Sequence, residues 1–144
     1  MRWALEVVVI AVTDIDRAKQ FYSEKLGFNL DHDNRSGDHF RVVQLTPPGS
    51  GCSIAFGKGL AEGEPGSIPG LQLVVPDLRK AREELIARGL DIGQIQYFDP
   101  AAGPRPATDD DNLDFSGFLF FSDPDGNNWA IQQASDEARP GLYA

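Results

Sequence analysis

The feature of this sequence that most constrains its fold is an internal repeat. The segment V-T-D-I-D-R-A at residues 12–18 recurs as V-P-D-L-R-K-A at residues 75–81. Self-similarity of this kind indicates a duplicated structural unit. Each copy follows a run of β-type apolar residues, and each places an aspartate, Asp14 or Asp77, where its carboxylate can cap the first turn of a helix. The repeat therefore predicts two modules that both begin with a strand and a helix.

Both predicted helices end at a glycine. Apolar residues recur at helical spacing before Gly27 in the first copy and before Gly89 in the second, and glycine commonly ends a helix. Three β-type segments, separated by polar or Pro/Gly turns, follow each helix. They cover residues 28–30, 40–45 and 52–56 in the first copy, and 91–98, 117–121 and 128–132 in the second. The predicted fold class is α+β, with two βαβββ modules.

The two modules account for nearly the whole chain. Its 144 residues, of which 41% are apolar, have the size and composition of a single domain. We assign module one to about residues 4–57, a linker to about 58–69, module two to about 70–134 and a C-terminal tail to about 135–144, all within one domain spanning 1–144. Residues 99–116 lack periodicity, which predicts a functional or mobile loop.

The charge of the chain limits its partners. Thirteen Lys and Arg against 22 Asp and Glu leave a net charge of −9, which disfavours nucleic acid and favours cationic ligands. No apolar run approaches the ~18 residues that a membrane span needs, and the first residues lack the pattern of a secretory signal. We therefore expect a cytoplasmic protein that binds neither membranes nor nucleic acid. Cys52 is the only cysteine, so no internal disulfide is expected.

Several short motifs carry a resemblance to a known family. They are the repeated helix start, the pair Phe21 and Tyr22, the triplet L-G-F at residues 26–28, and D-P-D-G-N at residues 123–127 before the last strand. Over about residues 4–134 the chain resembles the vicinal oxygen chelate superfamily, which includes glyoxalase I, extradiol dioxygenases, and fosfomycin- and bleomycin-resistance proteins. The resemblance implies that the two modules pair around a shared cleft and that the protein is a homodimer.

The same resemblance locates the positions at which metal-dependent members place their ligands. Those positions hold Val7, Gly70 and Ala130 here, and residues 53–57 of the fourth predicted strand contain neither a carboxylate nor an imidazole. A divalent cation needs three or four N, O or S donors at once. We therefore expect no metal and no other cofactor, since the sequence also lacks the familiar nucleotide-binding and hydrolase motifs.

Strand alternation then identifies which other residues share a face with those positions. Two residues further along each strand are Val9, Gln72 and Gln132, so both glutamines are expected to point into the cleft. A neutral amide offers donors and an acceptor, which suits orienting a ligand better than acid–base chemistry. The alternative is that each glutamine pairs with a neighbouring strand or with water.

Aromatic and acidic residues surround the predicted loop. Phe115, Phe118 and Phe120 follow it, and alternation puts Phe118 and Phe120 on one strand face and Phe121 on the other. With the four acids among residues 109–114, the loop forms either a lid over a planar or cationic ligand or a solvated, disordered segment. His32 and His39 lie in a polar stretch that is typical of a solvated hairpin turn.

These observations favour a metal-free protein that binds or sequesters a small organic molecule, aromatic or cationic, in the cleft. The alternatives are a vicinal oxygen chelate enzyme that uses a divalent metal, and a metal-independent enzyme or regulatory binder that uses neutral polar groups. The sequence offers no convincing acid, base or nucleophile for the last of these. The predicted ligand-binding residues are Val7, Val9, Gln72, Phe115, Phe118, Ala130 and Gln132.

Overall fold

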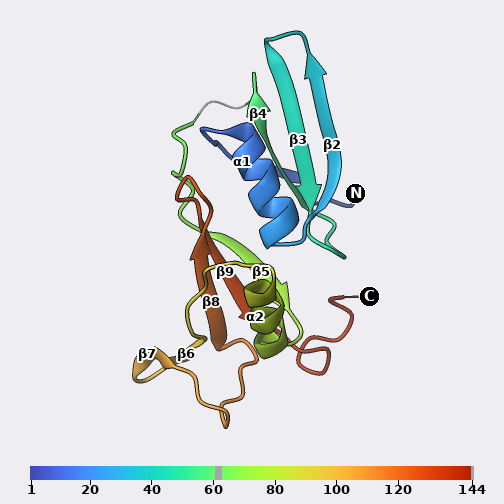
Figure 1. Ribbon diagram of the computed structural model, residues 1–144. Coiled ribbons are helices and arrows are strands. Elements are labelled where there is room, and N and C mark those ends of the chain that lie inside the picture. Colours follow the sequence, from blue (N-terminus) through green and yellow to red (C-terminus); the bar gives the residue numbers. More distant parts are fainter. Residues whose placement is uncertain (61–62, 144) are drawn as a thin grey trace. The chain divides into compact units, whose positions relative to one another are not determined.

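The computed structural model describes residues 1–60 and 63–143 (Figure 1). The chain divides into two compact units: unit 1 comprises Met1–Ile68 with Asp123–Asn127, and unit 2 comprises Pro69–Ser122 with Asn128–Ala144. The predicted linker includes residues 61 and 62 and the predicted tail includes residue 144, and these three positions lie outside the described residues.

Unit 1 contains the first predicted module. Its elements are β1 (Val7–Val9), α1 (Ile15–Gln20), the π-helical turn η1 (Phe21–Lys25), β2 (Asn29–Ser36), β3 (Phe40–Thr46) and β4 (Ser53–Lys58). In the described part of the chain, its strands form a sheet of order β1-β4-β3-β2, in which β1 runs parallel to β4 and the other pairs are antiparallel. The strand–helix–three-strand order is the predicted one.

The first helix begins and ends as predicted, but its second half has a different geometry. The Asp14 carboxylate caps α1 by accepting a 3.0 Å hydrogen bond from the backbone N–H of Arg17. After Gln20 the chain widens into η1, where the Leu26 N–H donates to the Phe21 carbonyl at 3.3 Å. Such π-helical turns usually occur within longer helices. The positive φ of Gly27, 72°, then ends the helical segment.

The polar stretch after the first helix is mostly strand, so its interpretation as a solvated turn is wrong for His32. β2 extends to Ser36 and pairs with β3, with His32 opposite Gln44 and a bulge between Leu30 and His32. Pairing with β3 satisfies the backbone of β2, while its polar side chains remain mostly exposed. Only the turn at residues 37–39, which contains His39, matches the interpretation.

Unit 2 contains the second predicted module and one additional strand. Its elements are β5 (Leu71–Val75), α2 (Leu78–Ala87), β6 (Gln96–Asp99), β7 (Gly103–Pro106), β8 (Gly117–Ser122) and β9 (Asn128–Gln133). Over the described residues, these strands form a sheet of order β5-β9-β8-β6-β7, in which β5 runs parallel to β9. Asp77 caps α2 through the backbone N–H of Lys80 at 3.1 Å, and Gly89 follows the helix with a φ of 86°. Both predicted caps are thus confirmed.

The additional strand, β7, lies inside the predicted aperiodic loop. β7 forms a hairpin with β6 and occupies the edge of the sheet, where Pro104 and Pro106 are tolerated because an edge strand does not need all its N–H groups. The hairpin turn is closed by Asp99, whose carboxylate accepts from the N–H groups of Ala101 and Ala102. These hydrogen bonds lower the pKa of Asp99. The prediction of a loop without secondary structure is therefore wrong for residues 103–106.

The fold is α+β with two βαβββ-like sheets, as the repeat predicts, and β7 makes the second sheet five-stranded. The arrangement of the modules around a shared cleft stays a prediction. Among the described residues, no helix is long and apolar enough to span a membrane.

Candidate ligand-binding face

The second sheet has one covered face and one open face. α2 lies against β8 and β9 (Figure 1), and Leu119, Phe121 and Ile131 are buried on one side of these strands. The alternate residues of the same strands are more accessible, and Phe120 is 49% exposed. Because side chains alternate along a strand, α2 covers the first set and leaves the second open.

Register assigns five of the predicted ligand-binding and aromatic residues to this open face. Gln72 pairs with Ala130, Ala130 with Phe120, and Gln132 with Phe118. Directly paired residues of neighbouring strands share a face. The prediction that Phe118 and Phe120 share one face while Phe121 takes the other is confirmed by the burial of Phe121.

Three phenylalanines form a cluster on the open face. The rings of Phe118 and Phe120 are nearly parallel, with centroids 6.1 Å apart. Phe98 of β6 meets both rings edge-on, at 5.2 Å from Phe118 and 6.2 Å from Phe120. Phe98 and Phe120 keep 38% and 49% of their surface exposed. We call the face that carries Gln72, Phe98, Phe118, Phe120, Ala130 and Gln132 the aromatic face.

A chain of amide hydrogen bonds runs beside the cluster. Gln72 Nε2 donates to Gln132 Oε1 at 3.0 Å, and Gln132 Nε2 donates to the backbone carbonyl of Phe115 at 3.0 Å. The two glutamines therefore pair with each other across neighbouring strands, as the alternative prediction has it. Gln72 Oε1 accepts no hydrogen bond from any described residue, so one end of the chain is free to bind a further partner.

The carbonyl at the end of this hydrogen-bond chain belongs to Phe115, which has an unusual backbone conformation. Its φ is +61°, a left-handed conformation that favours glycine. Its N–H donates to the Gln133 carbonyl at 2.8 Å and its own carbonyl accepts from Gln132, so β9 holds this conformation from two sides. Phe115 is 51% exposed. Backbone conformations of this kind are concentrated at functional sites.

The next residue along β9, Gln133, has a structural role. Its Oε1 accepts from the backbone N–H of the buried Leu78 at 3.0 Å, and its Nε2 donates to Asp114 at 3.1 Å. Burial by itself raises the pKa of Asp114, but the hydrogen bonds from Gln133 and Ser135 outweigh it and leave the pKa below its usual value. Gln132 and Gln133 thus make hydrogen bonds on opposite faces of β9.

The segment that contains the four acids at residues 109–114 is held by contacts of Arg105 within unit 2. Arg105 donates two hydrogen bonds to the Asp111 carboxylate, at 2.8 and 2.7 Å, and its guanidinium lies 4.6 Å from the centre of the Tyr97 ring. Arg105 and the N–H of Thr108 hold the pKa of Asp111 well below its usual range. Asp111 and Asp114 are therefore engaged in the fold, whereas Asp109 and Asp110 are exposed.

The predicted site residues are divided between the two units. Gln72, Phe118, Ala130 and Gln132 lie on the aromatic face, and the Phe115 backbone is bonded to it. Val7 and Val9 belong to the sheet of unit 1, where β1 pairs them with Ser53 and Ala55. Phe98 was not among the predicted site residues. Its aromatic side chain is visible in the sequence, but its place depends on β6 lying next to β8.

The environment of the aromatic face contains a hollow but no cluster of metal ligands. A hollow of about 380 Å³ at the end of β8 and the start of β9 is lined by residues from both faces of the sheet: Pro69, Phe120, Phe121, Ser122, Asn128 and Trp129. Within residues 1–60 and 63–143, no group of three or more His, Cys, Asp or Glu side chains is arranged to hold a metal ion.

Comparisons with known proteins show which family and which solved structures this chain resembles. The sequence profile described as Glyoxalase/Bleomycin resistance protein/Dioxygenase superfamily matches residues 4–131. No curated protein matches the chain significantly.

Solved structures resemble the chain over most of its length. TnmS3, an antibiotic binding protein from Streptomyces sp. CB03234, is 28% identical, with a TM-score of 0.68 over 93% of this chain and 98% of its own. A member of the same superfamily from Sphaerobacter thermophilus DSM 20745 is 27% identical, with a TM-score of 0.69 over 92% and 98%. UcmS2 is also 27% identical, with a TM-score of 0.67 over 92% and 98%.

Proposed function

We propose that this chain, which belongs to the Glyoxalase/Bleomycin resistance protein/Dioxygenase superfamily, binds a planar aromatic organic molecule on the aromatic face of its second sheet. The observation that carries this proposal is the exposed cluster of Phe98, Phe118 and Phe120 beside an amide chain with a free end. The bound molecule is sequestered rather than converted, since the face presents amides and aromatic rings and no acid, base or nucleophile.

Exposed aromatic surface supports a binding role on physical grounds. Leaving two phenylalanines more than one-third exposed forgoes part of the ~2 kcal/mol that burial of such a side chain contributes. A planar ligand that covers these rings recovers that free energy and adds stacking contacts. Contiguous apolar patches with a few polar groups are typical of ligand sites.

The relatives support the same class of function. TnmS3 is an antibiotic binding protein and aligns with nearly the whole chain. The resemblance implies metal ligands at the positions that hold Val7, Gly70 and Ala130 in this chain, and none of these side chains can coordinate a metal. Both points favour the binding members of the superfamily over the metal-dependent enzymes.

A titration with a fluorescent planar compound tests the proposal. β-Naphthol is expected to bind saturably, and Phe120→Ala is expected to weaken its binding about two- to tenfold, the loss that corresponds to one aromatic contact. The matched control is Phe40→Ala, which removes a similarly exposed ring from unit 1 and should leave binding unchanged. Equal binding by the two variants, or no saturable binding to the parent, would contradict the proposal.

A further inference from the structure

The orientation of the Gln132 and Gln72 amides can be assigned by starting from the Phe115 carbonyl. The last acceptor is the backbone carbonyl of Phe115, which has no proton to donate. The group of Gln132 that faces it must therefore be the NH₂, which turns the Gln132 carbonyl oxygen toward Gln72. Gln72 must in turn offer its NH₂ to that oxygen. A flipped amide at either residue would bring two acceptors or two donors together.

The free end of the chain is consequently a hydrogen-bond acceptor. Gln72 Oε1 has no partner among the described residues, and its side chain is exposed. The second N–H of Gln72 lies on the same terminal amide. A ligand group that donates, such as a hydroxyl or an amine, satisfies the oxygen, and a hydroxyl can also accept from the remaining N–H.

The register gives this acceptor a place relative to the aromatic cluster. Gln72, Ala130 and Phe120 form one row across β5, β9 and β8. Neighbouring strands are ~4.8 Å apart, so the two outer residues of the row are separated by ~10 Å across the small side chain of Ala130. A ring system that contacts Phe120 and lies over Ala130 therefore reaches Gln72 with its edge.

We infer, on the basis of the proposed function, that the ligand is a planar aromatic compound whose ring edge carries an O–H or N–H donor, bound over Ala130 with that donor on Gln72 Oε1. Gln132 is a positioning residue, because it orients the Gln72 amide without needing to contact the ligand. Ala130 leaves the space in which the ring lies.

Two matched probes separate this inference from the proposed function. β-Naphthol and its methyl ether share one ring system, but only the naphthol donates a hydrogen bond. The parent protein is expected to bind the naphthol several-fold to about tenfold more tightly, as one hydrogen bond to an otherwise unpaired acceptor implies. Gln72→Leu should lower the ratio of naphthol to ether affinity to about one, and Gln20→Leu, which changes an exposed glutamine of unit 1, should leave that ratio at its parent value.

Two further variants test whether Gln132 orients the Gln72 amide and whether the ligand lies over Ala130. Gln132→Leu keeps Gln72 but frees its amide to rotate, so the ratio of naphthol to ether affinity should fall below that of the parent. Ala130→Leu should reduce binding of both probes, with an unchanged melting temperature that shows the fold is intact. If the parent binds both probes equally and Ala130→Leu blocks both, this inference is overturned and the proposed function stands. If neither probe binds the parent, both are overturned.

Discussion

The hydroxyl of Tyr22 donates a 2.6 Å hydrogen bond to the carboxylate of Asp123, and both residues are buried in unit 1. The same carboxylate accepts from the backbone N–H groups of Asp125 and Asn127 and from the Asn127 side chain. The D-P-D-G-N motif thus folds around one buried carboxylate, to which the first helical segment contributes a donor.

Removing that donor should destabilise the protein. Tyr22→Phe keeps the ring in the core but deprives Asp123 of one hydrogen bond, at an expected cost of about 1.5–3 kcal/mol in the free energy of unfolding. Urea denaturation measures the loss. Tyr143→Phe, which removes a hydrogen bond to the backbone carbonyl of Ala134, should cost less because its acceptor is neutral. A larger loss for Tyr143→Phe would contradict the role given to Asp123.

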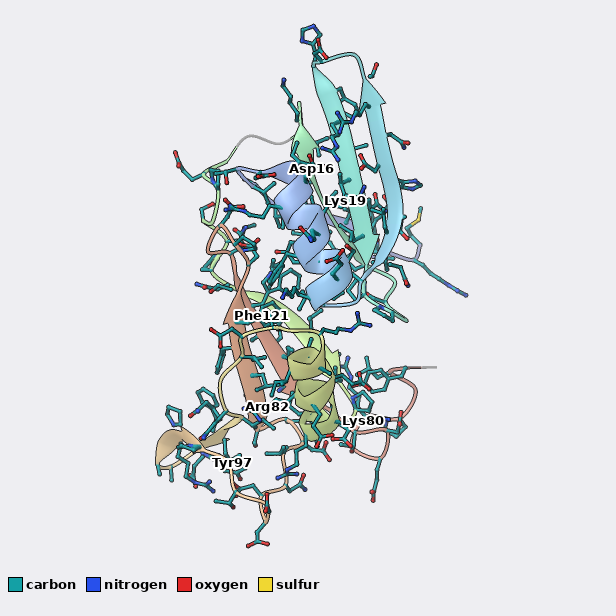
Figure 2. The ribbon with its side chains drawn as sticks, viewed as in Figure 1. Asp16, Lys19, Lys80, Arg82, Tyr97 and Phe121 are labelled. Atoms are coloured by element: carbon teal, nitrogen blue, oxygen red, sulfur yellow. The ribbon has the colours of Figure 1, made fainter. Side chains whose placement is uncertain are left out.

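An ionic cluster in unit 1 predicts a dependence of stability on pH. Asp16 and Lys19 of α1 (Figure 2) reach the pair formed by Arg41 and Asp33 on the sheet, and Arg41 contacts both oxygens of Asp33 at 3.0 and 2.9 Å. Arg41, and then Lys19, hold the pKa of Asp33 well below its usual range. A carboxyl with a lowered folded pKa stabilises the fold above its unfolded pKa of about 4, and this stabilisation is lost as the pH falls toward the folded pKa.

Arg41→Met tests this linkage. At neutral pH we expect a loss of about 2 kcal/mol, because Asp33 is left partly buried with Lys19 alone. The difference between parent and variant should shrink as the pH is lowered below about 4. Denaturation curves over a pH series provide the measurement, and a difference that grows on acidification would show that the sign is wrong.

Adjacent glutamines of β9 should differ in their effect on stability. Gln133→Leu leaves the buried N–H of Leu78 without its acceptor and removes a donor from Asp114, so we expect a loss of about 2 kcal/mol. Gln132→Leu changes a side chain on the aromatic face and should cost less than about 0.5 kcal/mol. Thermal unfolding compares the two, and similar melting temperatures would show that Gln133 does not support α2.

Purified protein is expected to contain no stoichiometric divalent metal. The reason is the chemistry of Val7, Gly70 and Ala130 at the positions where metal-dependent members of the family carry ligands. Elemental analysis is the measurement. About one tightly bound zinc, nickel, manganese or iron per chain, with an activity that a chelator removes, would place the protein among the metal-dependent enzymes instead.

We expect a homodimer in solution. β1 and β5 are edge strands of their sheets, and Trp3, which precedes β1, is 91% exposed. Open edges and exposed apolar side chains are commonly covered by two-fold association. Light scattering at micromolar concentration should give twice the chain mass of 15.7 kDa. A mass that stays at the monomer value as concentration rises argues against the dimer.

The sequence predicts most of the fold where the signals are local. Asp14 and Asp77 cap the helices because capping depends on one side chain and the next turn, and both hydrogen bonds are present. β2 was predicted too short because its residues are polar, and its pairing with β3 is a tertiary contact that propensity does not include. β7 was missed for the same reason, since its prolines are compatible with a strand only at a sheet edge.

The site was predictable in part. Alternation, counted from the ligand positions that the family resemblance implies, points Gln72 and Gln132 to the same side. The strand register then places Phe118 on that face with them. Alternation does not give the order of strands, so the contact of Phe98 with Phe118 was not foreseen. Nor does it give the backbone of Phe115, whose left-handed conformation supplies the carbonyl that orients both amides.

The membership of residues 123–127 in unit 1 has a consequence for synthesis of the chain. During synthesis, residues 1–68 are made before residues 123–127. Until residue 127 emerges, the Tyr22 hydroxyl, the Thr13 side chain and the Ile68 amide lack the partners that they have in the finished protein. A message truncated at the boundary between the repeats would therefore yield an incomplete first unit.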